Sequence, residues 1–167
     1  MGQEAAALAD RFEGMNQQLI ETVEGCSDAE WRTTTSREGW PVGVVAHHVA
    51  AGHRTIAELI RLAATGQPEP AMTLEMLDRT NAAHAAQHAG CTKAETLDLL
   101  RCNGSWASGM VRGLTDEELD RIVSAFRMRT YPSWVPAMSV GQTIERFLIG
   151  HIREHLGNIL SAIGPAS

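Results

Sequence analysis

Histidine is the residue type whose number and spacing in this sequence most clearly indicate chemistry. Seven histidines occur among 167 residues, and random placement would give about 0.25 pairs at the i,i+4 spacing that puts two side chains on one helix face. Two such pairs occur, His84/His88 and His151/His155. Because the neutral imidazole nitrogen is a common ligand for transition metals, this excess suggests a metal site.

The phase of the predicted helices separates inward-facing histidines from outward-facing ones. At about 100° per residue, His151 and His155 lie within about 60° of the centre of the apolar face of the last predicted helix. On the predicted helix that follows Trp40, His48 lies about 70° from the apolar centre, whereas His47 lies nearly opposite and is expected to face solvent. His48, His151 and His155 would then supply three imidazoles and leave a fourth position open, as a catalytic divalent metal requires. The alternative is that they are core or interface histidines satisfied by hydrogen bonds.

The His84/His88 pair is a second candidate for metal binding. It shares a helix face with Leu74, Leu77 and Asn81, and the surrounding alanines suggest a partly exposed helix. We rank this pair below the first three histidines, with an accessory role in a pocket as the alternative.

Residues 151–155 also spell H-x-x-E-H, the inverted zinc-protease motif, in which Glu154 would be the general base. Those enzymes take their third ligand from further along the chain, and only twelve residues follow His155. A third ligand is therefore expected from upstream, which argues against a protease.

The cysteines are interpreted as structural. Cys26, Cys91 and Cys102 are odd in number and form no C-x-x-C pair, which is typical of a reducing compartment. Cys91 adjoins a predicted helix N-terminus, where the pKa of a thiol could be lowered. Since no His or Asp partner is evident for it, a nucleophilic role is the less favoured interpretation.

Composition and charge narrow the class of protein. Hydrophobic residues make up 44% and charged residues 20%, which is typical of a globular chain, and the length suits one domain over residues 1–167. The net charge of −6 provides no basic field for nucleic acid or an anionic membrane surface. There is no apolar run of about 18 residues, and the N-terminus has acidic residues where a signal peptide needs basic ones. We therefore expect a cytoplasmic protein that binds neither nucleic acid nor membrane.

The spacing of apolar residues predicts helices joined by short loops, without the alternation that indicates a strand. Residues 126–138 contain two prolines and predict a crossover loop. The predicted fold is an all-α four-helix bundle with a long crossover connection and short extra helices. Capping-box spacings predict helix starts at Ser27, Thr92, Thr115 and Ser139. The predicted helical stretches cover residues 3–24, 41–65, 73–89, 92–112 and 139–163.

Two segments resemble motifs of the DinB-like superfamily. Its second-helix motif is similar to residues 39–52, GWPVGVVAHHVAAG, in which Trp40 precedes His48 by eight residues. Its closing H-x-x-x-H-x-G-x-I motif is similar to residues 151–160, HIREHLGNIL. The segments TNAAH, TKAETLDLL and LTDEELDR follow the family's usual order between them, so the resemblance covers nearly the whole chain.

The resemblance implies a four-helix bundle with a long crossover, often dimeric, whose metal-ligand positions fall on His48, His151 and His155. Three imidazoles suit a divalent transition metal, with Zn, Ni or Fe as the best candidates. Some members of this family are metal-assisted thiol transferases or isomerases that use mycothiol or bacillithiol.

These observations leave function open between hypotheses of different classes. The first is a metal-dependent thiol S-transferase or isomerase, with a low-molecular-weight thiol cosubstrate, a small electrophile and a lid formed by residues 131–136. A metal-dependent hydrolase is a variant of it, in which water is the nucleophile. The alternative is a non-enzymatic dimeric bundle that binds a ligand or partner, with the histidines structural or holding a stabilising metal. A homodimer is expected in either case.

Overall fold

A computed structural model describes residues 2–67, 73–123 and 137–164. Within this part of the chain, no helix combines the length and apolar character needed to cross a bilayer. The elements, in chain order, are α1 (Gln3–Gly25), α2 (Asp28–Trp31), α3 (Val42–Ala64), α4 (Leu74–Gln87), α5 (Lys93–Arg112), α6 (Asp116–Asp120), β1 (Ile122–Val123), β2 (Met138–Ser139), α7 (Val140–Thr143), the π-helix η1 (Ile144–Ile149) and α8 (Gly150–Ile163).

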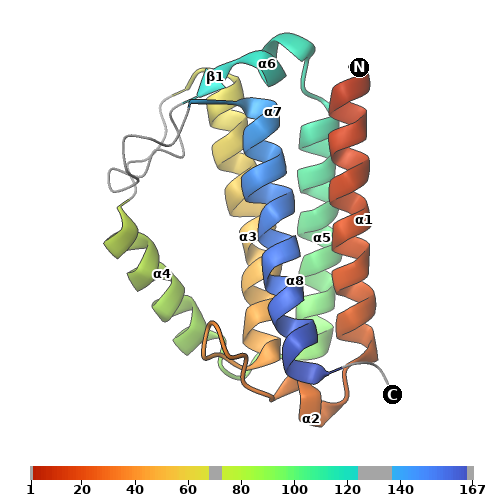
Figure 1. Ribbon diagram of the computed structural model, residues 1–167, viewed down its shortest axis with the longest axis vertical. Helices are drawn as coiled ribbons and strands as arrows, with labels where there is room; N and C mark the ends of the chain where they lie inside the picture. The colour runs from red at the N-terminus through yellow and green to blue at the C-terminus, as the bar shows by residue number, and fades with distance from the viewer. Residues whose placement is uncertain (1, 68–72, 124–136, 165–167) are drawn as a thin grey trace.

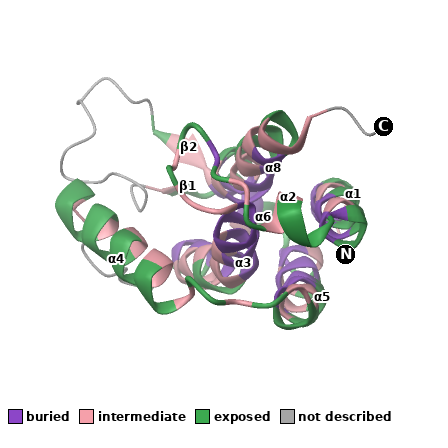
Figure 2. Ribbon diagram, turned by 90° about the horizontal axis from the view of Figure 1, so that it is seen from below, coloured by how far each residue is buried: buried purple, intermediate pink, exposed green. Residues whose placement is uncertain are grey.

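Four long helices form the bundle: α1, α3, α5 and the continuous α7–η1–α8 (Figure 1). Seen from the end of the bundle, their buried faces turn toward one another, whereas α4 lies outside this core (Figure 2). Helix α4 packs mainly against α3, and none of its described residues is buried. The prediction of an all-α four-helix bundle is confirmed.

Helix α1 shows how apolar spacing builds the core. Leu8, Phe12, Leu19 and Val23 are at most 2% exposed, and they recur at the spacing that places side chains on one helix face. Burying one side chain of this size contributes about 1.5–3 kcal/mol, so this row of residues determines which face of α1 turns inward.

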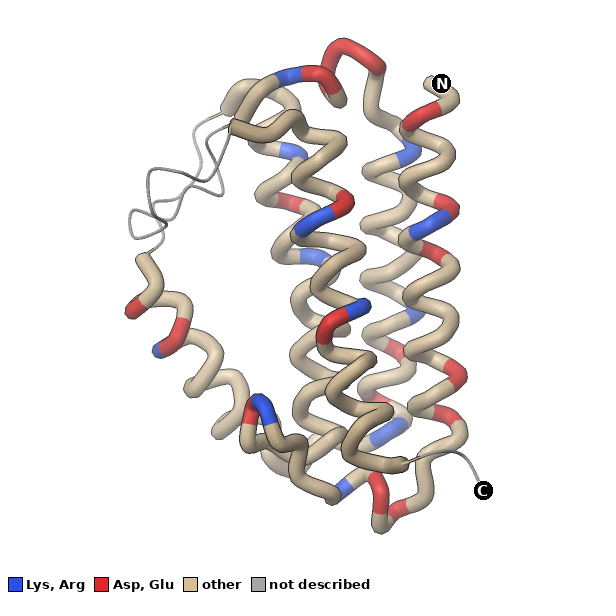
Figure 3. Tube along the Cα trace, in the orientation of Figure 1, with Lys and Arg blue, Asp and Glu red and all other residues tan. Residues whose placement is uncertain are grey.

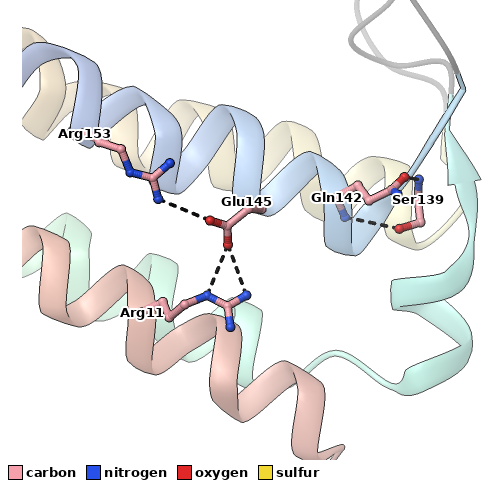
Figure 4. Close-up of polar contacts among 5 residues, drawn as sticks. All are labelled: Arg11, Ser139, Gln142, Glu145 and Arg153. Carbon is pink, nitrogen blue, oxygen red and sulfur yellow. Dashed lines mark hydrogen bonds and ion pairs between the residues drawn. The ribbon is translucent and has the colours of Figure 1, made fainter.

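The last helix begins at a capping box formed by Ser139 and Gln142 (Figure 4). The Ser139 hydroxyl accepts a hydrogen bond from the Gln142 backbone N–H at 3.2 Å, and Gln142 Oε1 accepts one from the Ser139 backbone N–H at 3.0 Å. The same reciprocal arrangement heads the helices that follow Ser27, Thr92 and Thr115. All four predicted capping boxes are therefore confirmed.

Glu145 joins the last helix to α1 (Figure 4). It accepts hydrogen bonds from the Nε and Nη2 atoms of Arg11 at 3.2 and 3.1 Å, and from Arg153 at 3.3 Å. Exposed ion pairs contribute little stability individually, so we assign these contacts mainly to the alignment of the two helices.

The last helix departs from the predicted regular α-helix over the six residues of η1. A π-turn contains one more residue than an α-turn, so the side chains that follow are rotated relative to a regular helix. The buried face accordingly runs through Leu148, Ile149 and Ile152, whereas Phe147 is half-buried.

Two short strands were not predicted. Strands β1 and β2 pair antiparallel, with Ile122 opposite Ser139, and each contains only two residues. That length is too short to show alternation. The predicted crossover loop, residues 126–138, lies outside the described residues except for its last two positions, and the proposed lid at residues 131–136 lies wholly outside them.

A buried polar contact joins α1 to α3. His53 is 0% exposed, and its Nε2 donates to Asn16 Oδ1 at 2.8 Å. Asn16 Nδ2 in turn donates to the Leu100 carbonyl at 3.1 Å. Burial lowers the pKa of His53 to about 3, so this side chain is neutral in the folded protein at neutral pH.

Acid is therefore expected to destabilise the fold through His53. Below the ordinary histidine pKa of about 6.5, the unfolded chain binds a proton that folded His53 does not bind until about pH 3. Over this window the free energy of unfolding should fall with pH by up to about 1.4 kcal/mol per unit for this residue. The variant His53→Gln keeps an N–H donor for Asn16 but does not titrate, so its unfolding free energy should fall less steeply.

Urea unfolding at about pH 6 and about pH 5 measures this difference. The other histidines titrate in both proteins, so the contrast between their slopes isolates His53. Equal slopes for the wild type and His53→Gln would contradict the assignment.

Candidate metal centre

Three histidines from two facing helices lie together in the bundle. His48 comes from α3, and His151 and His155 come from α8. One ring nitrogen of each lies within 4.8 Å of the corresponding nitrogens of the others, and the Nε2 atoms of His48 and His151 are 3.2 Å apart. We call these three residues the first cluster.

Gly52 makes the close approach of α3 to His151 possible. It lies one turn after His48 on α3, and a Cβ atom at this position would lie 2.9 Å from His151 Cε1. Carbon atoms do not approach this closely, so a larger residue at position 52 would displace the imidazole.

The variant Gly52→Ala is therefore expected to weaken metal binding at the first cluster by about tenfold, the effect typical of disturbing the supports of a ligand. Gly14→Ala is the matched control, because a Cβ at that position of α1 meets nothing within 4 Å. It should stabilise its helix by about 0.5–1 kcal/mol without changing Zn²⁺ affinity. Titration of Zn²⁺ against a competing chelator dye measures both variants, and equal affinities for them would contradict the role of Gly52.

Glu38, a residue that the sequence analysis did not select, holds His155 in place. His155 Nδ1 donates to Glu38 Oε1 at 2.8 Å, and Asn158 Nδ2 donates to the same oxygen at 2.7 Å. The Glu38 side chain is 9% exposed. Because the proton of His155 lies on Nδ1, its Nε2 lone pair is free, which is the arrangement by which a carboxylate orients a metal-binding histidine.

Burial favours the neutral imidazole at two residues of the first cluster, His48 and His151. Burial, with smaller contributions from His155 and His84, lowers the pKa of His48 to about 4. Burial also lowers the pKa of His151 well below its usual value, and His151 Nδ1 is a buried atom without a hydrogen-bond partner in the described chain. Neutral, desolvated nitrogens close together fit a divalent transition metal.

The carboxyl group of Glu38 remains ionised. Burial alone would raise its pKa, but the hydrogen bonds of Glu38, chiefly with Thr35 and Asn158, outweigh burial and lower the pKa overall. A negative charge behind His155 would strengthen that imidazole as a metal ligand and would partly offset the charge of a bound cation.

Glu154, the general base suggested by the H-x-x-E-H spelling, does not join the first cluster. It is exposed and forms an ion pair with Arg37. The helix phase of α8 turns Glu154 away from the side on which His151 and His155 lie.

The expectation of a lowered thiol pKa at Cys91 is wrong. Burial raises the pKa of Cys91, because the thiol is half-buried and donates to the Gly43 carbonyl at 3.4 Å. Burial likewise raises the pKa of Cys26. These environments suit the structural interpretation of both residues.

The expectation that His47 faces solvent is also wrong, because α4 covers the face of α3 that carries it. His47 is 6% exposed. Its Nδ1 lies 3.2 Å from His84 Nε2, and its ring stacks on that of His88 with centroids 4.1 Å apart. One ring nitrogen of each of these three residues lies within 4.8 Å of the others, and we call them the second cluster.

The two clusters touch each other. The rings of His48 and His84 meet edge to face, with centroids 5.4 Å apart. A surface cleft of about 720 Å³ opens beside the second cluster, lined in part by His47, His88 and Cys91. Adjacent residues of α3 thus take part in different clusters, one toward α8 and one toward α4.

Comparison with known proteins identifies a family, and the solved structures that match include a four-helix bundle. The model of the DinB superfamily matches residues 11–159. The solved structure of YfiT from Bacillus subtilis matches with a TM-score of 0.71 and 19% sequence identity, covering 97% of this chain and 87% of that one. YfiT is described as a probable metal-dependent hydrolase with an unusual four-helix bundle topology. At this identity the match establishes the fold, and no curated protein sequence matches the chain.

Proposed function

This chain belongs to the DinB superfamily, and on that premise we propose that His48, His151 and His155 hold a divalent transition metal. We propose further that the protein is a thiol S-transferase or isomerase acting on a small electrophile. The observation that carries the proposal is the first cluster itself, three ring nitrogens within 4.8 Å of one another with an ionised carboxylate behind one of them.

A divalent cation at this site would supply Lewis acidity, lowering the pKa of a thiol or water that approaches it. A free thiol, with a pKa near 8.5, needs a shift of only about 1.5 units to be half ionised at neutral pH. Water needs a shift of about nine units. Glu38, behind His155, would offset part of the charge of a cation at the first cluster, and Glu154 is exposed and paired with Arg37. Activating a thiol therefore requires a smaller pKa shift from this site than activating water does.

Neighbouring residues would hold the ligand histidines in place during the reaction. Glu38 fixes the orientation of His155, and the Trp40 ring packs edge to face on His48 with centroids 5.7 Å apart. In a transfer reaction the thiol loses its proton to solvent, its sulfur bonds to the electrophilic carbon, and the leaving group departs with the bonding electron pair. In an isomerisation the thiol adds and is later eliminated.

A metal-dependent hydrolase is the second candidate. Three imidazoles with an open fourth position are also the ligand set by which a metal activates water. The description of YfiT as a probable metal-dependent hydrolase also favours this candidate.

Turnover assays separate these functions. Protein loaded with Zn²⁺ or Ni²⁺ would be incubated with a small aryl halide or epoxide and with mycothiol, bacillithiol, glutathione or cysteine in turn. The expected result is thioether formation that needs the metal, is lost in His155→Ala and is retained in Glu154→Gln. Metal-dependent cleavage of ester or amide substrates without added thiol would instead identify a hydrolase. Inactivity in both assays would favour a non-enzymatic bundle that binds a ligand or partner.

The other expectations drawn from the sequence stay predictions: a homodimer, a cytoplasmic location, a single domain over residues 1–167, and no nucleic-acid or membrane partner. Size-exclusion chromatography with light scattering measures the first of these directly.

A further inference from the structure

Helix α4 is attached to the bundle through a largely polar face. It leans away from the bundle at its N-terminal end and approaches α3 at its C-terminal end (Figure 1). The half-buried residues that recur along its inner face are Leu77, Asn81, His84 and His88. Leu77 is the one large apolar residue among them, whereas Leu74 and Met76 are exposed. Apolar burial, which normally holds an amphipathic helix in place, is therefore small here.

The second cluster occupies the end of α4 that meets α3. Its geometry repeats that of the first cluster, in which an i,i+4 histidine pair on one helix faces a single histidine of α3. In the first cluster α8 provides the pair and His48 the third side chain; in the second, His84 of α4 and its C-cap residue His88 form the pair, and His47 is the third. Side chains of neighbouring residues on a helix point about 100° apart, so the adjacent residues His47 and His48 of α3 can each take part in a different cluster.

The charged side chains nearest the second cluster are acidic, because Glu95 and Asp98 of α5 line the cleft beside it and Glu95 interacts with His47. Residues 42–53 of α3 and residues 80–91, at and after the C-terminal half of α4, include no Lys, Arg, Asp or Glu. The charged residues of α4 lie toward its other end (Figure 3). Three imidazoles packed within 4.8 Å, with no nearby side chain of these helices to repel a cation, form a donor set suited to Zn²⁺, Ni²⁺ or Cu²⁺.

We infer that His47, His84 and His88 form a second transition-metal site, separate from the first cluster, and that a metal bound there fastens α4 to the bundle. The metal replaces the apolar contacts that the inner face of α4 lacks, because its binding free energy is available only when α3 and α4 are together. The contact between His84 and His48 places this fastened helix beside the first cluster.

The stoichiometry of Zn²⁺ binding tests the second site, with Zn²⁺ alone as the probe. The wild type should bind about two ions per chain, and His155→Ala and His88→Ala about one each. The double variant His88→Ala/His155→Ala should bind none with comparable affinity. Asn81→Ala is the matched control, since Asn81 lies on the same face of α4 but offers no imidazole, and it should leave the stoichiometry unchanged.

The variants distinguish failure of this inference from failure of the proposed function. If His155→Ala binds no Zn²⁺ while the wild type binds one ion, the second site is overturned and the first stands. If His88→Ala has the same stoichiometry and affinity as the wild type, the second site is likewise overturned.

Amide hydrogen exchange tests the fastening itself, in the His155→Ala background where the second site acts alone. If opening of α4 releases the metal, exchange at residues 74–87 should slow in proportion to free Zn²⁺, by about 100-fold at 100 times the dissociation constant. The same residues should show no such slowing once His88→Ala is added. Zn²⁺ binding that leaves exchange of α4 unchanged would overturn the fastening role.

Discussion

Replacing His155 by alanine is expected to weaken Zn²⁺ binding at the first cluster by more than about a hundredfold. The substitution removes one of three nitrogens within 4.8 Å of one another. Loss of an outer partner alone weakens a metal site by about 10- to 100-fold, and loss of a direct ligand should exceed this. Competition with a chelator dye, in the His88→Ala background so that the first cluster is observed alone, gives the affinity.

Glu154→Gln is the matched control for this measurement. Glu154 precedes His155 on the same helix but is exposed and paired with Arg37. Glu154→Gln should therefore bind Zn²⁺ with the same affinity as the His88→Ala protein into which it is introduced. An unchanged affinity in His155→Ala, or an equal loss in Glu154→Gln, would contradict the assignment of His155 as a ligand.

The second large effect is expected at Glu38. Glu38→Gln keeps an oxygen that can accept from His155 Nδ1 but removes the negative charge, so the imidazole becomes a weaker ligand. We expect Zn²⁺ affinity at the first cluster to fall by about 10- to 100-fold, as is typical when the partner of a ligating histidine is changed. Competition with the same chelator dye measures the Zn²⁺ affinity of Glu38→Gln.

Asn158→Ala provides the comparison for Glu38→Gln. Asn158 donates to the same carboxylate oxygen without contacting the histidine through that bond, so its loss should reduce the affinity by much less. If Asn158→Ala weakens binding as much as Glu38→Gln does, the effect arises from general loosening of the loop before α3 and not from the charge on Glu38.

The fold was predictable because its signals are local. Apolar spacing in α1 and capping boxes such as Ser139/Gln142 depend on residues within one or two turns of each other, and the structure contains them as predicted. The π-helix η1 was not predictable in this way. The apolar spacing of this segment was interpreted as that of a regular α-helix, and it does not reveal the extra residue of a π-turn.

The candidate site was predictable only in part. Helix phase correctly turned His48 inward, where it meets His151 and His155. It failed for His47, because a phase argument assumes one buried face, and α4 covers a second face of α3. Glu38 lies in a loop and meets His155 117 positions away along the chain. An isolated acidic residue in a loop belongs to no periodic pattern. The one feature of the sequence that could have drawn attention to Glu38 was its position just before the segment that contains Trp40.

Metal content per chain tests the central claim most directly. Elemental mass spectrometry would be applied to wild-type protein and His155→Ala, both purified without a histidine tag and incubated with Zn²⁺ or Ni²⁺. The account predicts at least about one tightly held ion per wild-type chain and the loss of about one ion in His155→Ala. Wild-type protein that retains no metal, or a variant that retains as much metal as the wild type, would contradict it.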